Sequence, residues 1–420
     1  MADDLFKLPG AARLHDPAFY LGDPHPYYEQ LRRCAPVYWY EPDDPEYLPF
    51  WVITRHALIR RISLDTEHFT AAEGILINDN TRGARARGYV SSAQIPAGAE
   101  PLAITDAPRH TQLRALAMKA FTPRLLYRLE NGIRGIVDDV LAAVPDGEVF
   151  DFVESVAVPI PIYVIARLLG VPTEDWADFK RWADDAVAGG GEITPELLAR
   201  LQRSAAEIQA YLTRHISERQ RAPRDDLISA LSTVEHQGES FNFPNLLLMA
   251  RTILAAGNET TRNSLSLMLC ALLEHPDQLR LLQQRPELVP GAVDELLRYV
   301  TTTIGMCRRV KRDIELEGRR LRAGEFVHLN FQAANRDETV WPDAHRLDVT
   351  RKLDPMHLAF GHGRHICMGA TLARLELRIA LERLLQTFAR FEAAGEPRRV
   401  ASNLINTTVA LPLRFFRENA

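Results

Sequence analysis

The sequence predicts a mainly α-helical fold with a small β region, organised as a single large domain over residues 1–420. Three observations support this prediction. Apolar residues recur at helical spacing through most of the chain. Runs rich in β-branched and aromatic residues are few and lie far apart. No repeat, charge block or Gly/Ser-rich tether marks a domain boundary.

Eight helices are predicted from apolar residues that return every three or four positions. They occupy residues 27–33, 56–63, 108–121, 124–144, 195–220, 243–275, 291–300 and 370–388. Short strands are predicted from runs of β-forming residues. They occupy residues 37–40, 50–54, 314–316, 326–329 and 409–415. We therefore expect the β region to join segments that are far apart in the sequence.

Composition and charge exclude several classes of partner. With a net charge of −5, the chain has no feature that favours nucleic acid or an anionic membrane. The first 20 residues carry charges and prolines and lack the apolar core of a signal peptide, so we expect a cytoplasmic protein. The longest apolar stretch, 246–273, is interrupted by charged and amide residues, which indicates a buried helix and no membrane anchor.

Two segments are predicted to be irregular. Residues 79–100 hold several Gly, Ser and Arg residues and would form either a gate over a pocket or a solvated surface loop. Arg82, Arg85 and Arg87 in this segment would either meet a substrate carboxylate or remain solvated. Residues 335–355 form an unusually long coil for a compact fold, so we expect it to serve something fixed.

The four cysteines are scattered and include no Cys-x-x-Cys pair, which gives no support to a disulfide framework or a zinc finger. Cys367 lies in the run Phe-Gly-His-Gly-Arg-His-Ile-Cys-Met-Gly at 360–369, directly before the predicted helix 370–388. A thiolate at that place faces free backbone N–H groups and the positive end of the helix dipole. We expect these to lower the thiol pKa and prepare it to bind a metal.

Neighbours of Cys367 suit a flat cofactor. Gly369 would let the first helical turn pack close to it, and His365 can donate a hydrogen bond to an acidic group on it. Two alternatives stay open: an inert buried cysteine beside a glycine turn, and a zinc site. The zinc ligands would be His357, His362, His365 and Cys367, although their crowding in one loop fits a flat cofactor better.

This ten-residue loop resembles the cysteine-loop signature of the cytochrome P450 family, matching its Phe360, both glycines, the His or Arg position, the cysteine and the final glycine. The resemblance implies the cytochrome P450 fold and haem b (iron protoporphyrin IX), with Cys367 as the iron ligand and Phe360 and Gly369 beside the haem. It also implies the reaction, in which one atom of O2 enters a C–H bond and the other leaves as water.

The middle of the predicted helix 243–275 carries the run Ala-Gly-Asn-Glu-Thr-Thr at 256–261. A mid-helix glycine costs about 1 kcal/mol against alanine, which suggests a use. The run is similar to the family's acid–alcohol pair, with Glu where many members have Asp. The resemblance implies that Gly257 opens a groove for dioxygen, Thr260 hydrogen-bonds the oxygen or its water, and Glu259 relays protons from solvent. Close helix packing is the alternative explanation.

Glu295 and Arg298 lie three residues apart on a predicted helix, so their side chains can meet. Taken alone, such a pair is usually a surface pair of little value. In the family, the Glu-x-x-Arg pair is buried and joined by an arginine from the coil before the cysteine loop. Arg351 matches that partner, although Leu347 stands where the family usually has Phe. We expect a buried network that holds this coil.

Three basic residues match the family's haem propionate partners. His110 and Arg114 lie four apart on one face of the predicted helix 108–121, and Arg308 lies five residues before Asp313. Buried propionates need cationic or hydrogen-bonding partners. Without the resemblance, all three would be interpreted as solvated surface charges.

The substrate pocket is expected to be mostly apolar, which favours a bulky lipophilic small molecule. Its candidate wall residues are Met249, Ile253, Ala256, Thr303, Ile304 and Ile405. The run 257–263 looks like that of members that hydroxylate sterols, terpenoids or long alkyl chains. A polyketide-like or aromatic natural product is nearly as well supported.

No flavin or iron–sulphur segment is found in the chain, so the resemblance implies that electrons come from a separate ferredoxin and ferredoxin reductase. We expect them to dock near the cysteine side, where Arg109, Lys119, Arg124 and Arg364 are candidate contacts or else ordinary solubilising charges. Two other functions stay open: a peroxide-driven oxygenase and a haem-thiolate gas sensor. Neither needs a proton relay, so the acid–alcohol pair argues against both.

Overall fold

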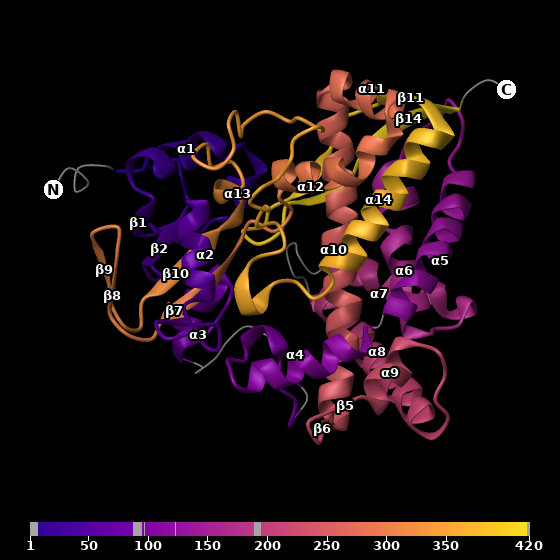
Figure 1. The fold of residues 1–420 in the computed structure, drawn as a ribbon, viewed down its shortest axis with the longest axis horizontal. Coiled ribbons are helices and arrows are strands. Elements are labelled where there is room, and N and C mark those ends of the chain that lie inside the picture. The colour runs from indigo at the N-terminus through magenta and orange to yellow at the C-terminus, as the bar shows by residue number, and fades with distance from the viewer. Residues whose placement is uncertain (1–6, 87–94, 96, 122, 189–194, 418–420) are drawn as a thin grey trace.

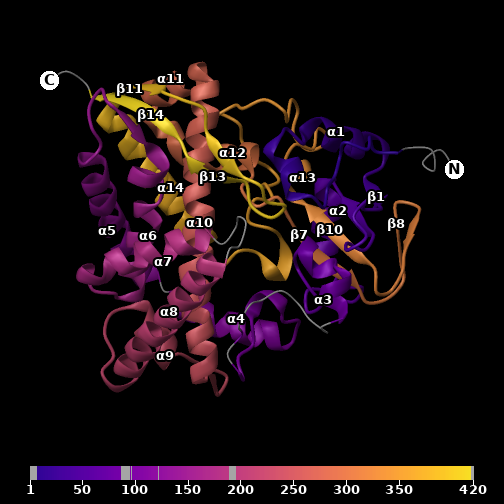
Figure 2. The same ribbon diagram turned by 180° about the vertical axis from the view of Figure 1, so that it is seen from behind.

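The computed structural model describes residues 7–86, 95, 97–121, 123–188 and 195–417. Figure 1 shows helices filling one side of the molecule, while the main β-sheet lies on the other side with α1 (His25–Cys34) and α2 (His56–Leu64). The view from behind in Figure 2 shows the same division. The predicted mainly α fold with a small β region is confirmed.

All eight predicted helices are present, with ends shifted by at most two residues. The helices besides α1 and α2 are α3 (Arg82–Ala86), α4 (Arg109–Ala120), α5 (Pro123–Ala142), α6 (Pro159–Leu169), α7 (Trp176–Ala188), α8 (Pro195–Arg221), α9 (Leu227–Thr233), α10 (Phe243–Glu274), α11 (Pro276–Gln284), α12 (Val289–Val300), α13 (Phe331–Ala334) and α14 (Ala370–Thr387). Helices α3, α6, α7, α9, α11 and α13 were not predicted.

Helix α10 is the axis of the helical side. The Asn242 side chain caps it by accepting a hydrogen bond from the backbone N–H of Asn245, and Pro244 lies in its first turn. It runs unbroken for 32 residues, which is about 48 Å at 1.5 Å per residue. It packs against α6, α8, α12 and α14, and its buried side chains join the largest apolar core. The run 256–261 therefore lies near the middle of the molecule.

The main sheet has five strands in the order β1-β2-β10-β7-β3. They are β1 (Val37–Tyr40), β2 (Phe50–Ile53), β10 (Phe326–Asn330), β7 (Gly305–Val310) and β3 (Phe69–Thr70). Strands β2 and β10 run parallel, with Phe50 opposite Phe326, and the other neighbours are antiparallel. The expectation that distant segments build the β region is confirmed.

Smaller sheets lie elsewhere. Three strands form one sheet in the order β11 (Phe388–Ala393), β14 (Pro412–Arg417) and β4 (Val149–Asp151). The two-stranded sheets are β12 (Arg398–Val400) with β13 (Thr407–Ala410), β5 (Glu235–His236) with β6 (Glu239–Ser240), and β8 (Ile314–Leu316) with β9 (Arg319–Leu321). The single strand predicted at 409–415 is wrong, because β13 and β14 divide this segment between two different sheets.

Within the described ranges, no helix is both long enough and apolar enough to cross a membrane. The apolar stretch 246–273 belongs to α10, where Arg262 and Asn263 are buried in the protein. The buried helix expected there is confirmed.

Candidate active site

A cavity of about 400 Å³ lies where α4, α10 and α14 meet the segment around 302–308 and the cysteine loop at 360–369. Most of its wall is apolar. The predicted site residues that line it are His110, Arg114, Met249, Ile253, Ala256, Gly257, Thr260, Thr303, Arg308, Phe360, His365, Cys367 and Gly369. Folding thus collects residues from distant parts of the sequence around one space.

Three residues predicted for the site do not line this cavity. Ile304 is fully buried in a core cluster of the β region. It follows Thr303 in an extended segment, where successive side chains point to opposite sides. Ile405 pairs through its backbone with Thr303 and its side chain does not reach the cavity. Glu259 is half-buried on α10, away from the cavity wall.

Cys367 is held at the cavity wall by the loop that precedes α14. Its backbone N–H donates to the carbonyl of Phe360 at 2.9 Å, and its side chain is open to the cavity. Burial raises the pKa of the thiol, while the backbone N–H of Gly369 and the charges of two nearby arginines act in the lowering direction. The predicted net lowering is wrong, because burial outweighs the helix start. A bound cation would supply the stabilisation that the thiolate lacks.

Two glycines of the loop have different reasons to be glycine. Gly363 has a φ of +72°, and a Cβ there would lie 2.3 Å from the carbonyl oxygen of Ser63 at the end of α2. A Cβ on Gly369 would lie 3.8 Å from Sγ of Cys367, which is an ordinary contact distance. No other described part of the protein packs closely against Gly369, and this residue lines the cavity beside the thiol. This arrangement leaves room beside the thiol for a flat cofactor.

Four basic side chains gather along the cavity wall: His110 and Arg114 from α4, Arg308 from β7, and His365 from the cysteine loop. The rings of His110 and His365 lie 4.2 Å apart. Nε2 of His110 is buried without a hydrogen-bond partner, and Nη1 of Arg308 donates only to the carbonyl of Cys307. Within the described ranges, no carboxylate forms an ion pair with any of the four.

The electrostatics of these four residues fit an anionic ligand. Burial, together with the charges of Arg308 and His110, lowers the pKa of His365 to about 3, and the nearby carboxylate of Asp106 opposes this shift. Burial also lowers the pKa of His110 and that of Arg308. The charge of Asp106 opposes the lowering of all three pKa values, but its carboxylate forms no ion pair with these residues. Basic groups that lie together with no anion at ion-pair distance disfavour their own charge. The two carboxylates of a haem would provide that counter-ion, so these residues fit the cofactor that the cysteine loop implies.

The Glu295–Arg298 pair is fully buried at the end of α12. Nε of Arg298 donates to Oε2 of Glu295 at 2.7 Å and Nη2 donates to Oε1 at 2.8 Å. Nε of Arg351 donates to the same Oε1 at 3.2 Å. The predicted three-residue network is confirmed by these contacts.

This network also holds the coil 335–355. Nη1 of Arg298 donates to the carbonyls of Asn335 and Ala344, each at 2.7 Å. The backbone N–H of Asp348 donates to Oε1 of Glu295 at 3.1 Å. Buried carbonyls and N–H groups of an irregular segment need hydrogen-bond partners. The Glu295–Arg298 pair supplies these hydrogen bonds, which a helix or strand would make within its own backbone. The Glu295–Arg298 pair thus fixes the backbone of the coil, which leads along the chain into the cysteine loop.

The centre of α10 is a regular helix. The hydroxyl of Thr260 donates to the carbonyl of Ala256 at 2.8 Å. A Cβ on Gly257 would lie 2.7 Å from Cδ1 of Ile165 on α6. A side chain at 257 would therefore force the end of the Ile165 side chain to shift, which supports the packing alternative, although Gly257 also lines the cavity. Burial raises the pKa of Glu259, opposed by the charge of Arg262.

Among the polar residues of the cavity wall that sequence reasoning missed are Glu376, Asn245 and Glu100. Glu376 on α14 is buried, its Oε2 has no hydrogen-bond partner among the described residues, and burial raises its pKa well above the usual range. Its signal was an acid on the apolar face of the predicted helix 370–388. Oδ1 of Asn245 accepts from the backbone N–H of Glu100 at 2.7 Å, and Arg109 donates to the Glu100 carboxylate at 2.7 Å. No local sequence pattern predicts the cluster of Asn245, Glu100 and Arg109.

Two alternatives from the sequence lose support. Among the described residues, no group of three or more side chains could hold a metal as a zinc site would, and Nε2 of His357 instead bonds to Asp294 at 3.0 Å. Arg82 and Arg85 do not reach the cavity, since they bond to backbone and side-chain groups around the β region. Arg87 and the rest of the segment 87–94, part of the predicted gate, lie outside the described residues.

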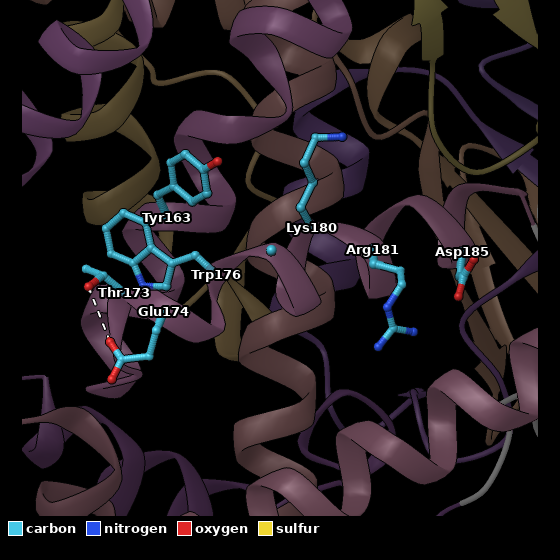
Figure 3. Close-up of a pocket in the computed structure, with 8 residues that line it drawn as sticks. Tyr163, Thr173, Glu174, Trp176, Lys180, Arg181 and Asp185 are labelled. Carbon is cyan, nitrogen blue, oxygen red and sulfur yellow. Dashed lines mark hydrogen bonds between the residues drawn. The ribbon is translucent and has the colours of Figure 1, made fainter.

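A second depression, of about 610 Å³, lies along α6, α7 and the turn between them. Tyr163 and Trp176 stack there with ring centroids 4.7 Å apart. Figure 3 shows Lys180 and Arg181 pointing away from each other, and Glu174 bonded to its neighbour in the chain. These charges do not converge on one point, so the cavity at Cys367 is the candidate active site.

Comparison with known proteins gives consistent matches. The family model described as Cytochrome P450 matches residues 193–408. Linalool 8-monooxygenase of Pseudomonas putida is 33% identical over 91% of this chain and 93% of its own length. The cytochrome P450 monooxygenase PikC of Streptomyces venezuelae is 35% identical over 95% of this chain and 92% of its own. The solved structure of cytochrome P450 CYP109Q5 from Chondromyces apiculatus has a TM-score of 0.84 and 34% identity, covering 97% of this chain and 98% of that one.

These matches extend the resemblance from the cysteine loop to nearly the whole chain. They agree with a mostly apolar cavity that a thiol and four basic side chains line together. The chain belongs to the cytochrome P450 family of haem-thiolate monooxygenases.

Proposed function

We propose that this protein binds haem b through Cys367 and inserts one atom of O2 into a C–H bond of a bulky lipophilic small molecule. The observation that supports this most is the shared cavity, which the Cys367 thiol lines together with four basic side chains that form no ion pair with a carboxylate among the described residues. The iron of a haem would be a cation beside the thiolate, and the haem propionates would be anions beside the basic groups. We also propose that residues 1–420 act as one domain, which the pairing of β2 with β10 supports.

Each residue of the site has a task in this proposal. Cys367 binds the iron, and His110, Arg114, Arg308 and His365 bind the propionates with charge-assisted hydrogen bonds. When bound, the haem supplies the oxidising chemistry, and the protein supplies position, electrostatics and protons. Phe360 and Gly369 shape the wall beside the thiol.

Proton supply is the task proposed for Thr260 and Glu259. The Thr260 hydroxyl lines the cavity and holds a proton at Oγ1, which it donates to Ala256 in the resting structure. Glu259 is half-buried with a raised pKa, so it can hold or release a proton closer to neutral pH than a solvated acid does. Because Glu259 does not line the cavity, it would act through Thr260 or through water.

A lipophilic substrate is supported by the apolar wall that Met249, Ile253 and Ala256 of α10 contribute. The names of the relatives point to several lipophilic molecules. One relative is a linalool monooxygenase, another is a hydroxylase/epoxidase of mycinamicin IV, and CYP109E1 from Bacillus megaterium was solved with corticosterone and with testosterone. A terpenoid, sterol-like or polyketide-like compound is therefore the proposed substrate class.

A separate ferredoxin and its reductase are the proposed electron donors, docking on the cysteine side. Among the described residues, Arg364 donates one hydrogen bond to Thr111, and Lys119 donates one to the backbone of the β5–β6 hairpin. Neither forms an ion pair there, so we expect their charges to be available to an acidic partner. Arg109 is a poorer contact than expected, because it is already paired with Glu100 and Glu239. The side chain of Arg124 lies outside the described residues.

The test begins with the reduced protein under carbon monoxide. We expect the strongly red-shifted absorption of a thiolate-bound haem, lost on Cys367→Ser and kept on Cys34→Ser, which changes an exposed cysteine on α1 as a matched control. If Cys367→Ser keeps that absorption, the proposal is wrong.

Turnover then separates the three functions. Product formed from lipophilic candidates with ferredoxin and reductase supports the monooxygenase. Product formed with peroxide but not with ferredoxin and reductase indicates the peroxide-driven oxygenase. Haem binding without product under either condition indicates the gas sensor.

A further inference from the structure

Two neighbouring acids on α12, Asp294 and Glu295, bind different parts of the protein. Glu295 holds the coil 335–355, as described above. Asp294 holds the cysteine loop and the helix behind it, because its Oδ1 accepts from Nε of Arg374 at 2.7 Å and from Nε2 of His357 at 3.0 Å. The Glu295 contacts are part of the network expected from the sequence, whereas the Asp294 contacts were not expected.

These contacts enclose the ring of Phe360. The guanidinium carbon of Arg374 lies 4.5 Å from the centroid of the Phe360 ring. The ring of His357 lies 5.8 Å from the same ring, tilted by 40°. Phe360 in turn accepts the backbone hydrogen bond from Cys367 through its carbonyl. The positive charge of Arg374 is thereby fixed beside the cysteine loop.

The hydrogen bonds define the charge state of this cluster. Nδ1 of His357 accepts from the backbone N–H of Ala359 at 3.1 Å, so the ring proton is on Nε2 and points at Asp294. Burial opposes ionisation of Asp294, but hydrogen bonds from His357 and Arg374 outweigh it and lower the Asp294 pKa. The cluster thus consists of one fixed cation, one fixed anion and one neutral imidazole.

We propose that Arg374 and Asp294 form a positioning pair that sets the reduction potential of the haem bound at Cys367. This inference rests on the proposed function, because it needs a haem at that cysteine. Reduction adds one electron to the site, so a fixed positive charge nearby stabilises the reduced form and a fixed negative charge destabilises it. Arg374 therefore raises the potential, and Asp294 both orients the guanidinium over Phe360 and offsets part of its charge.

The two residues predict opposite shifts. Arg374→Gln should lower the potential and Asp294→Asn should raise it, each by roughly a tenfold change in the equilibrium constant for reduction. That is the scale Coulomb's law gives for unit charges about 10 Å apart at an effective dielectric near 20. The double variant should return toward the unsubstituted protein. Arg374→Lys keeps the charge and should shift the potential less than Arg374→Gln does.

The experiment is a spectroelectrochemical titration of the haem-loaded proteins, with the carbon monoxide spectrum recorded for each. Arg383→Gln is the matched control, because Arg383 lies on the same helix, is 34% exposed against 33% for Arg374, and is paired with Asp138. It should leave the potential unchanged. A purely structural role would move both Arg374→Gln and Asp294→Asn in the same direction or not at all, and either result overturns the inference.

Failure of the inference and failure of the proposed function are distinguishable. If the unsubstituted protein lacks the thiolate-type spectrum, the proposed function is wrong. If that spectrum is present and the two potentials do not move in opposite directions, only this inference is wrong. If Arg374→Gln does not fold, an upward shift in Asp294→Asn together with a small shift in Arg374→Lys supports the inference, and no shift in Asp294→Asn rejects it.

Discussion

Two groups of buried charges lie on either side of the cysteine loop, and they differ in whether the protein completes them. Under the loop, Glu295, Arg298 and Arg351 satisfy one another and the coil 335–355. Around the cavity, His110 and Arg308 and their basic neighbours form no ion pair with a carboxylate in the described part of the chain, and only the more distant charge of Asp106 acts on them. The first group is complete in the protein alone and serves the fold. The second is complete only with an anionic ligand and serves binding.

The largest expected effect comes from breaking the complete group. Glu295→Gln leaves the charge of Arg298 buried without its partner, which should lower the free energy of unfolding by about 3–5 kcal/mol. Denaturant unfolding of the haem-free protein measures this. If the free energy of unfolding falls by less than about 1 kcal/mol, Arg298 finds other partners and its group does not depend on Glu295.

Breaking the incomplete group should affect binding more than folding. Arg308→Leu removes a charge-assisted hydrogen bond to the haem, worth about 1.5–3 kcal/mol, or roughly tenfold to a hundredfold in haem affinity. The unfolding free energy of the haem-free protein should stay equal or rise, because an unpaired buried charge is gone. Haem transfer to an acceptor protein and denaturant unfolding measure the two quantities. A large loss of stability without haem would contradict the assignment.

The middle of α10 offers a smaller test, because packing and oxygen binding both explain its glycine. Gly257→Ala places a methyl against Ile165 and should cost about 1–3 kcal/mol of stability through overpacking. Combining it with Ile165→Val should recover part of that loss. Thermal unfolding of the single and double variants is the measurement. If Gly257→Ala alone stabilises the protein, as relief of a mid-helix glycine would, packing is not its reason.

The last effect is absent at neutral pH and grows as the pH falls, because it is a change in acid sensitivity. The pKa of His365 is lowered to about 3 in the folded protein without haem, against about 6.5 in an unfolded chain. The unfolded state therefore binds the proton first, and stability is lost as the pH falls from about 6.5 toward about 3. His365→Asn should flatten this dependence in the haem-free protein. Unfolding curves across that range would show equal slopes if the interpretation is wrong.

Much of the fold follows from local pattern, and the exceptions have physical causes. Helix α6 escaped prediction because its sequence, Pro-Ile-Pro-Ile-Tyr-Val-Ile-Ala-Arg-Leu-Leu, is apolar almost throughout, with Arg167 as its one exposed residue, and holds two prolines. Such a segment has no amphipathic period to detect, and it is helical because other helices bury it. The strand predicted at 409–415 failed because neighbouring residues joined different sheets, which no local pattern records.

The site was predictable where a motif names each residue and less so where tertiary contacts decide. Cys367 and the Glu295 network follow from short patterns that resemble the family. Thr303 and Ile304 could not be told apart, because their alternation depends on which side of an extended segment faces the cavity. The Asp294–Arg374 contact joins residues that are distant in sequence and carry no local signal.

The parallel pairing of β2 with β10 has a consequence for synthesis. The strands near residue 50 leave the ribosome long before the partner strand near residue 326 exists. Until then their apolar faces and unpaired edges have no native cover, so the emerging chain is exposed to misassembly during most of translation. Truncated products that end before β10 should accordingly aggregate, and holding chaperones should associate with the nascent amino-terminal segment more than with any later part of the chain.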